Sequence, residues 1–126
     1  AVKVLTDETG KAVGLRAEDA GKDARFREKF DVCCARAVAR LNTLAEYCLP
    51  LVRTGGRFVA YKGASGEEEA DECAHALSVL GAKEFARERF SLPEGAGERV
   101  LFAAEKISHT PAAYPRGNGK ERSRPL

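Results

Sequence analysis

Strand-like and helix-like segments alternate along most of this chain, and that alternation limits its fold more than any other feature. Residues 31–36 and 57–63 are short apolar runs of strand length, and residues 41–52 between them carry apolar side chains at helical spacing. A second helix is expected over 66–80, ending at Gly81. Because strands that alternate with helices indicate βαβ units, we expect an α/β fold built on a parallel sheet.

The remaining segments add an antiparallel edge and two less regular pieces. Residues 82–91 and 98–106 are strand-like and are separated by a turn rich in glycine, so they predict a hairpin. At the other end of the chain, residues 1–9 favour a helix over a strand, and residues 11–15 a short strand. The charged connector over 21–30 is expected to form a short helix.

Three local signals predict how the central elements begin and end. Pro50 should kink the last turn of the first helix, and residues 54–56, which contain two glycines, predict a turn before the next strand. Ser65 and Glu68 have the spacing of a capping box. The acidic run over 67–72 is interpreted as a solvated first turn that compensates the helix dipole, in preference to a metal site.

Composition and charge exclude several classes of protein. The chain has 126 residues, of which 44% are hydrophobic, which suits a single domain. Its 21 Lys and Arg residues nearly balance 19 Asp and Glu residues, so a net charge of +2 argues against a polybasic nucleic-acid binder. No stretch of 18 uncharged apolar residues and no secretory leader occur, so we expect a cytoplasmic protein without a membrane span.

The four cysteines are interpreted as buried, reduced side chains. No C-x-x-C pair occurs, and neither histidine lies at a metal-binding spacing from them. Two adjacent cysteines on a strand also point to opposite faces, which does not suit a shared metal ion. We therefore predict neither disulfides nor a metal site.

The ends of the predicted strands supply the candidate site residues. In open α/β sheets the ligand lies beyond the carboxyl ends of the strands. Arg36 ends one apolar strand, where its guanidinium would bind either a ligand carboxylate or a neighbouring acidic side chain. Lys62 offers a second cation or is a surface lysine, and Glu18 either accepts hydrogen bonds from a ribose or amine or caps a helix.

The sequence holds no motif of nucleophilic catalysis and no obvious pair of catalytic carboxylates. It has no Gly-x-Ser-x-Gly motif, no supported Cys–His pair and no glycine-rich phosphate loop. The glycines within 54–56 lie between a helix and a strand, which is the wrong place for such a loop. Composition and spacing alone therefore indicate a partly basic α/β domain with a ligand-binding mouth.

Several segments taken together resemble one family over nearly the whole chain. They are Arg16-Ala17-Glu18, Phe30-Asp31-Val32-Cys33-Cys34-Ala35-Arg36-Ala37-Val38-Ala39, Tyr47-Cys48-Leu49-Pro50-Leu51-Val52, Gly55-Gly56-Arg57-Phe58-Val59-Ala60-Tyr61-Lys62-Gly63, Glu67-Glu68-Glu69, Lys106-Ile107-Ser108-His109-Thr110-Pro111, Tyr114-Pro115-Arg116 and Pro125-Leu126. In this order they are similar to the small-subunit ribosomal RNA methyltransferase G family, also called glucose-inhibited division protein B. Each segment is weak alone, but the Arg-Ala-Glu, Ala-Arg-Ala-Val-Ala and Tyr-Pro-Arg set is specific.

The resemblance implies a Rossmann-like fold that binds S-adenosylmethionine and transfers its methyl group to N7 of a guanine in 16S ribosomal RNA. By that likeness Ala17 and Glu18 would line the adenine end of the cofactor, and Arg36 would lie near the reacting end. The implied partner is 16S ribosomal RNA or the small ribosomal subunit, bound by a monomer without a metal ion. The implied RNA-phosphate contacts are Lys62, Arg116, Lys120, Arg122 and Arg124.

The resemblance also implies a missing part. The family's glycine-rich cofactor loop, and the acidic residue that holds the ribose, lie on the first two strands, and both strands would precede residue 1. We therefore expect residues 1–106 to be a partial methyltransferase domain and residues 107–126 to be its basic tail. We also expect the isolated 126-residue chain to bind S-adenosylmethionine poorly or not at all. Three alternatives stay open: a methyltransferase of this fold with a non-RNA substrate, a non-catalytic RNA-binding or partner-binding fragment, and a purely structural fragment.

Overall fold

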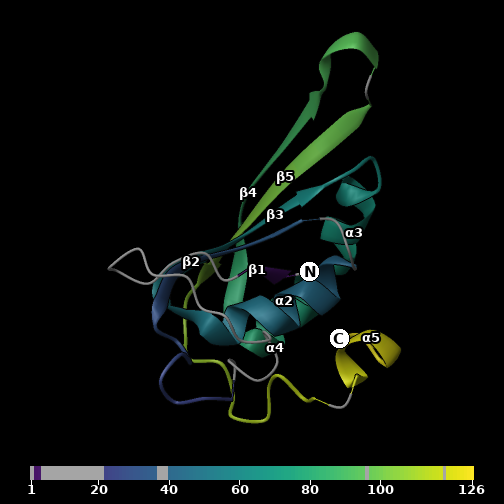
Figure 1. The fold of residues 1–126 in the computed structure, drawn as a ribbon. Coiled ribbons are helices and arrows are strands. Elements are labelled where there is room, and N and C mark those ends of the chain that lie inside the picture. The colour runs from purple at the N-terminus through teal and green to yellow at the C-terminus, as the bar shows by residue number, and fades with distance from the viewer. Residues whose placement is uncertain (1, 4–21, 37–39, 96, 118) are drawn as a thin grey trace.

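A single mixed sheet organises the part of the chain that the computed structural model describes, namely residues 2–3, 22–36, 40–95, 97–117 and 119–126. The sheet has five strands in the order β1-β2-β3-β5-β4 (Figure 1). They are β1 (Val2–Lys3), β2 (Phe30–Arg36), β3 (Val52–Lys62), β4 (Ala82–Ser91) and β5 (Glu98–Lys106). Because β2 and β3 are parallel and β4 and β5 form an antiparallel hairpin, both the α/β class and the predicted hairpin are confirmed.

The described helices are short and belong to two groups. The helices α2, α3 and α4 lie along one face of the sheet, whereas α5, near the carboxyl terminus, lies farther from the sheet (Figure 1). The 3-10 segment η1 joins α2 to β3, and η2 lies in the hairpin turn. Their bounds are α2 (Leu41–Cys48), η1 (Leu49–Leu51), α3 (Gly66–Glu72), α4 (Ala74–Leu80), η2 (Pro93–Gly95) and α5 (Lys120–Ser123).

The core lies between the sheet and this helix layer. Along β3 the side chains of Phe58 and Ala60 are fully buried, and those of the alternate residues are more exposed, as expected of a strand covered on one face. Phe102 of β5 meets Phe58 edge-on, with ring centroids 6.4 Å apart. Leu41 and Leu44 of α2 are fully buried against this face. The apolar side of the helix predicted over 41–52 is therefore the side that faces the core.

The helix predicted over 41–52 ends earlier than expected. The α-helix stops at Cys48, and the last turn, in which a kink at Pro50 is predicted, is the 3-10 segment η1. The turn predicted over 54–56 is wrong, because β3 runs through it with a register shift against β2. Gly55 adopts φ +89°, and a Cβ on Gly56 would lie 2.6 Å from a backbone oxygen of β2, so this glycine pair makes a bulge in the strand.

The helix predicted over 66–80 is divided into α3 and α4 at Cys73. It ends at Gly81 as predicted, since that residue is left-handed with φ +87° and its carbonyl accepts the N–H groups of Ile107 and Ser108. The predicted capping box is wrong: Ser65 makes no side-chain bond to the helix backbone, and its hydroxyl instead bonds the carboxylate of Glu69.

Two predictions near the amino terminus are also wrong. Residues 22–28 form hydrogen-bonded turns in place of the short helix predicted over 21–30, with the N–H groups of Phe26 and Arg27 donating to the carbonyl of Asp23. Within the segment 1–9, where a helix was favoured, Val2–Lys3 pairs antiparallel with β2 as β1. The strand predicted over 11–15 lies outside the described residues.

The burial predicted for the cysteines is confirmed for three of the four. Cys33, Cys48 and Cys73 are buried and Cys34 is half-buried, and no disulfide joins these four described residues. Burial raises the pKa of the Cys73 thiol to about 12, which suits a reduced core side chain. Among the described residues there is no cluster of three metal-ligating side chains, and no helix is long and apolar enough to cross a membrane.

Candidate functional site at the carboxyl ends of the parallel strands

The two parallel strands end on the same side of the sheet. Arg36 ends β2 and is in register with Tyr61 of β3, and Lys62 ends β3. The start of α2, helix α3 and helix α5 lie on the side toward which these two strands point (Figure 1). This is the side where α/β proteins bind their ligands, and we call it the carboxyl edge. The positions of Ala17 and Glu18 lie outside the described residues.

Lys62 is placed by the structure inside the protein. Its side chain is 5% exposed, and its ammonium lies 3.0 Å from the Oε1 atom of Glu69. A lysine in this position is not presented to an RNA phosphate in solvent, so the geometry does not favour the phosphate contact that the family resemblance implies. The surface-lysine alternative is wrong, because the side chain is buried and paired.

Glu69 joins three elements at the carboxyl edge. Besides Lys62, its carboxylate accepts the N–H of Leu41 at 2.8 Å and the hydroxyl of Ser65 at 2.8 Å. Burial alone would raise the pKa of Glu69, but the hydrogen bonds from Ser65, Lys62 and Leu41 lower it below its ordinary value. The carboxylate is therefore the charged form, held by partners from β3, α2 and the start of α3.

The amino terminus of α2 depends on this contact. Arg40 is the N-cap residue, but its side chain makes no capping hydrogen bond, and it pairs with Glu72 of α3 instead. Because the first N–H groups of a helix lack partners within it, Glu69 supplies from α3 the acceptor that a capping side chain would provide. This role was not predictable from the sequence, because Glu69 lies 28 residues after Leu41 and in a different helix.

Arg116 is held by a buried glutamate from α2. Its guanidinium donates from Nη2 to Oε1 of Glu46 at 2.9 Å and from Nε to Oε2 at 3.0 Å, and its backbone N–H donates to Oε2 at 2.9 Å. The Glu46 side chain is fully buried and that of Arg116 is 22% exposed. The hydrogen bond to Glu46 raises the pKa of Arg116 above its ordinary value. This arrangement does not favour Arg116 itself as a phosphate contact.

The other basic residues of the tail are exposed on or beside α5. Lys120, Arg122 and Arg124 are all solvent-exposed. The helix is tied to α2 by Thr43, whose hydroxyl donates to the carbonyl of Glu121 at 2.8 Å. The structure thus places two cations on a short helix and a third directly after it, and this helix lies toward the carboxyl edge (Figure 1).

A separate network connects the tail, residues 107–126, to the end of the sheet opposite the carboxyl edge. The fully buried ammonium of Lys106 donates to the carbonyl oxygens of Leu49 and Val52 at 2.7 and 2.9 Å, and lies 3.1 Å from the Glu28 carboxylate. Glu28 also accepts the N–H of Thr110 at 2.8 Å. Burial alone would raise the pKa of Glu28, but hydrogen bonds from Thr110, His109 and Lys106 lower it to about 2. This network is structural and holds no predicted site residue.

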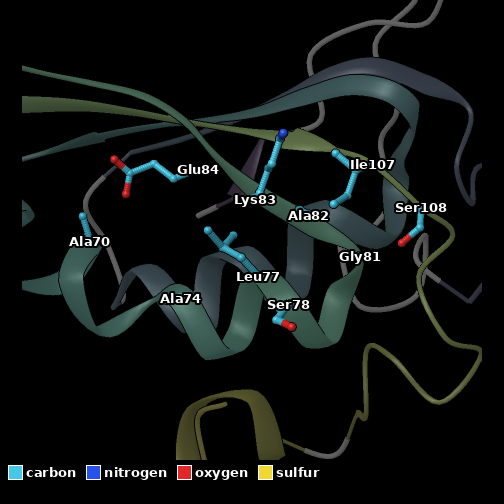
Figure 2. Close-up of a pocket in the computed structure, with 10 residues that line it drawn as sticks. All are labelled: Ala70, Ala74, Leu77, Ser78, Gly81, Ala82, Lys83, Glu84, Ile107 and Ser108. Atoms are coloured by element: carbon cyan, nitrogen blue, oxygen red, sulfur yellow. The ribbon is translucent and has the colours of Figure 1, made fainter.

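One described pocket lies away from the carboxyl edge. Figure 2 shows it between α4, the start of β4 and the residues after β5. Its volume is about 370 Å³. Its walls are mainly small or apolar, such as Ala74, Leu77 and Ile107, with Lys83 and Glu84 at one side. Because Gly81 and Ile107 lie near the amino end of β3, this pocket does not belong to the candidate site.

The fold gives the class of the protein, and comparison with known proteins gives the family. The mixed sheet, with its helix layer on one face and a candidate site at the carboxyl ends of adjacent parallel strands, defines a domain of the α/β class. Residues 1–95 match the family described as rRNA small subunit methyltransferase G (GidB), and the chain belongs to that family. The resemblance seen in the sequence is therefore confirmed.

The curated relatives agree with this family. The chain is 50% identical over 111 residues to "Ribosomal RNA small subunit methyltransferase G" of Lactobacillus acidophilus, and 51% identical over 111 residues to the protein of that name in Staphylococcus aureus. In both comparisons 88% of this chain and 46% of the relative are covered. The chain thus spans about half the length of the relatives it matches.

Solved structures overlap with the chain only partly. The antibiotic-resistance methyltransferase Kmr is 16% identical with a TM-score of 0.48, over 65% of this chain and 53% of Kmr. A T. thermophilus 16S rRNA methyltransferase, solved with S-adenosylmethionine and guanosine, is 19% identical with a TM-score of 0.45, over 73% of this chain and 24% of that protein.

Proposed function

We propose that this chain is part of an S-adenosylmethionine-dependent methyltransferase that modifies N7 of a guanine in 16S ribosomal RNA. The observation that carries the proposal is the 50% identity to proteins named ribosomal RNA small subunit methyltransferase G across 88% of the chain. The carboxyl edge supports it, because that edge is where a Rossmann-like sheet binds its ligand. The proposed substrate is naked 16S ribosomal RNA or the small ribosomal subunit, in the cytoplasm.

The proposed cofactor contacts are Ala17 and Glu18 at the adenine end and Arg36 near the reacting end. Support for Arg36 comes from its backbone position, as the last residue of β2 beside the end of β3. These side chains suit the cofactor. The Glu18 carboxylate can accept hydrogen bonds from the ribose hydroxyls, and the Arg36 guanidinium can bind the carboxylate of the methionine part. The buried ion pair of Lys62 and Glu69 helps to hold the carboxyl edge in place.

The proposed RNA contacts are Lys120, Arg122 and Arg124. All three are exposed on the segment that includes α5, and α5 packs against α2, whose amino end lies at the carboxyl edge. Cations gathered at one place bind RNA phosphates and position the strand without reading its sequence. Basic residues beside the methyl-transfer site would hold the target guanine close to it.

The proposed chemistry requires positioning more than proton transfer. When bound, S-adenosylmethionine supplies a methyl group on a positively charged sulfur. N7 of guanine carries a lone pair and no proton, so the N7–methyl bond forms as the sulfur–methyl bond breaks, and no general base is required. The absence of an evident catalytic base in the sequence agrees with this reaction.

A hybrid protein tests the proposed function. In the hybrid, the 111 residues of this chain that match the Staphylococcus aureus relative replace the corresponding segment of that relative, so that the protein has the relative's full length. It is incubated with S-adenosylmethionine labelled in the methyl group and with 16S ribosomal RNA, a protein extract or a pool of metabolites. We expect label in the RNA alone. Label in protein or metabolites would instead support a different substrate, and RNA binding without transfer would support a non-catalytic module.

A further inference from the structure

Arg116 reaches beyond its buried partner to the backbone of α5. Besides the two-pronged contact with Glu46, its Nη2 atom donates to the carbonyl of Arg124 at 2.6 Å and lies 3.2 Å from that of Lys120. Arg124 is the C-cap residue of α5, and the last carbonyl groups of a helix lack partners within it. Arg116 therefore caps the carboxyl end of α5 while Glu46 fixes the guanidinium.

The start of α5 is held by a second set of contacts. The N–H of Gly117 donates to Oε2 of Glu121 at 2.7 Å, and the hydroxyl of Thr43 donates to the carbonyl of Glu121. A helix of four residues has too few internal hydrogen bonds to be stable alone. Its shape and place therefore depend on these tertiary contacts, and the Glu46–Arg116 pair supplies the strongest of them because it is charged, bidentate and buried on one side.

We propose that the Glu46–Arg116 ion pair is a positioning device for RNA binding: it holds α5 so that Lys120, Arg122 and Arg124 contact RNA phosphates as one unit. In this arrangement Arg116 contributes through α5 and makes no phosphate contact of its own. The inference rests on the proposed RNA substrate, and it assigns Arg116 a role different from the one implied by the family resemblance.

Two substitutions leave the net charge unchanged and distinguish a positioning role from direct contact with RNA. Arg116→Lys keeps one positive charge but loses the planar fork that bonds Glu46 and the α5 carbonyl groups. Arg122→Lys keeps a positive charge at an exposed position that bonds phosphate as a point charge. We measure binding of in vitro transcribed 16S ribosomal RNA to the 126-residue chain at several salt concentrations, because the slope of log affinity against log salt counts phosphate contacts.

We expect Arg116→Lys to weaken RNA binding at least about tenfold at 0.15 M salt and to reduce the salt slope by about 2, since three contacts contribute ~0.7 each. Arg122→Lys should change neither quantity appreciably. Glu46→Gln should also weaken binding, although it makes the chain more positive and a simple charge effect would strengthen binding. If Arg116→Lys behaves like Arg122→Lys, or if Glu46→Gln binds RNA more tightly, the inference is overturned.

Limited proteolysis tests, in the absence of RNA, whether the Glu46–Arg116 ion pair holds α5 in place. Trypsin should cut between Arg122 and Ser123 faster in Arg116→Lys and Glu46→Gln than in the unsubstituted chain, while a thermal melt of the rest of the fold checks that these variants remain folded. Glu121→Gln is the matched control, because a glutamine oxygen can still accept the Gly117 N–H. Equal cutting in all four proteins overturns the positioning device. Faster cutting combined with no RNA binding by the unsubstituted chain instead overturns the RNA part of the proposed function, and with it the role given to α5.

Discussion

The Lys62 ammonium and the Glu69 carboxylate form a buried ion pair at the carboxyl end of β3, with Nζ 3.0 Å from Oε1. The same oxygen accepts the first N–H of α2, from Leu41, at 2.8 Å. One carboxylate therefore connects the end of β3, the start of α2 and helix α3. These are the elements that surround the proposed cofactor-binding edge, so their relative positions depend on Glu69.

Removal of the Glu69 carboxylate should be far more costly than removal of a neighbouring exposed one. Glu69→Ala leaves the buried Lys62 charge without its carboxylate, and breaking such a pair costs about 3 kcal/mol or more. Glu72→Ala removes the exposed partner of Arg40 and should cost less than about 1 kcal/mol. Urea unfolding followed by circular dichroism measures both, and equal losses would show that Glu69 does not hold this edge together.

Gly66 should be intolerant of a side chain, although it lies at a helix start. A Cβ there would lie 2.8 Å from the Cβ atoms of both Lys62 and Val100, which are backbone-proximal atoms that move only with their strands. We expect Gly66→Ala to destabilise the fold by about 1–3 kcal/mol. Gly63→Ala is the matched control, because no atom lies within 4 Å of its added Cβ. A stabilising effect of Gly66→Ala would contradict the close packing of α3 on the sheet.

Glu28 should make the fold sensitive to acid. Its pKa is about 2 in the folded chain against an ordinary value of 4.5, so its stabilising contribution is fully present above pH 4.5 and is lost as the pH falls toward 2. Because the side chain is partly exposed, we expect a loss of about 2 kcal/mol over this range. The free energy of unfolding, measured from pH 5 to 2.5, should fall less steeply in Glu28→Gln. Parallel curves for the two proteins would exclude this role.

The arrangement of the sheet was predictable where it depends on local spacing. The apolar run that became β2, the helical spacing of α2 and the turn signals around 92–97 each indicate their element directly. The bulge at Gly55 was not predictable, because two glycines between apolar segments signal a turn and a bulge equally well. The division of the second long helix at Cys73 likewise has no signal in the spacing of its residues.

The candidate site was predictable in place but not in detail. The rule that ligands bind at the carboxyl ends of strands located the edge, and charge alone indicated the basic tail. The partners of Lys62 and Arg116 were not predictable, since Glu46 lies 70 residues before Arg116 and an exposed cation has the same sequence pattern as a paired one. Burial, which only the fold determines, decides between a phosphate contact and an internal ion pair.

The position of the transferred methyl group tests the central proposal most directly. The hybrid with the Staphylococcus aureus relative is expressed in bacteria that lack their own methyltransferase of this family, and nucleosides from purified 16S ribosomal RNA are measured by mass spectrometry. We predict that the hybrid restores 7-methylguanosine, and that Arg36→Ala in the same hybrid abolishes or strongly reduces it. A folded hybrid that yields no 7-methylguanosine, or that methylates another atom of the RNA, would contradict the proposed function, and full activity of the Arg36→Ala hybrid would contradict the cofactor contact assigned to Arg36.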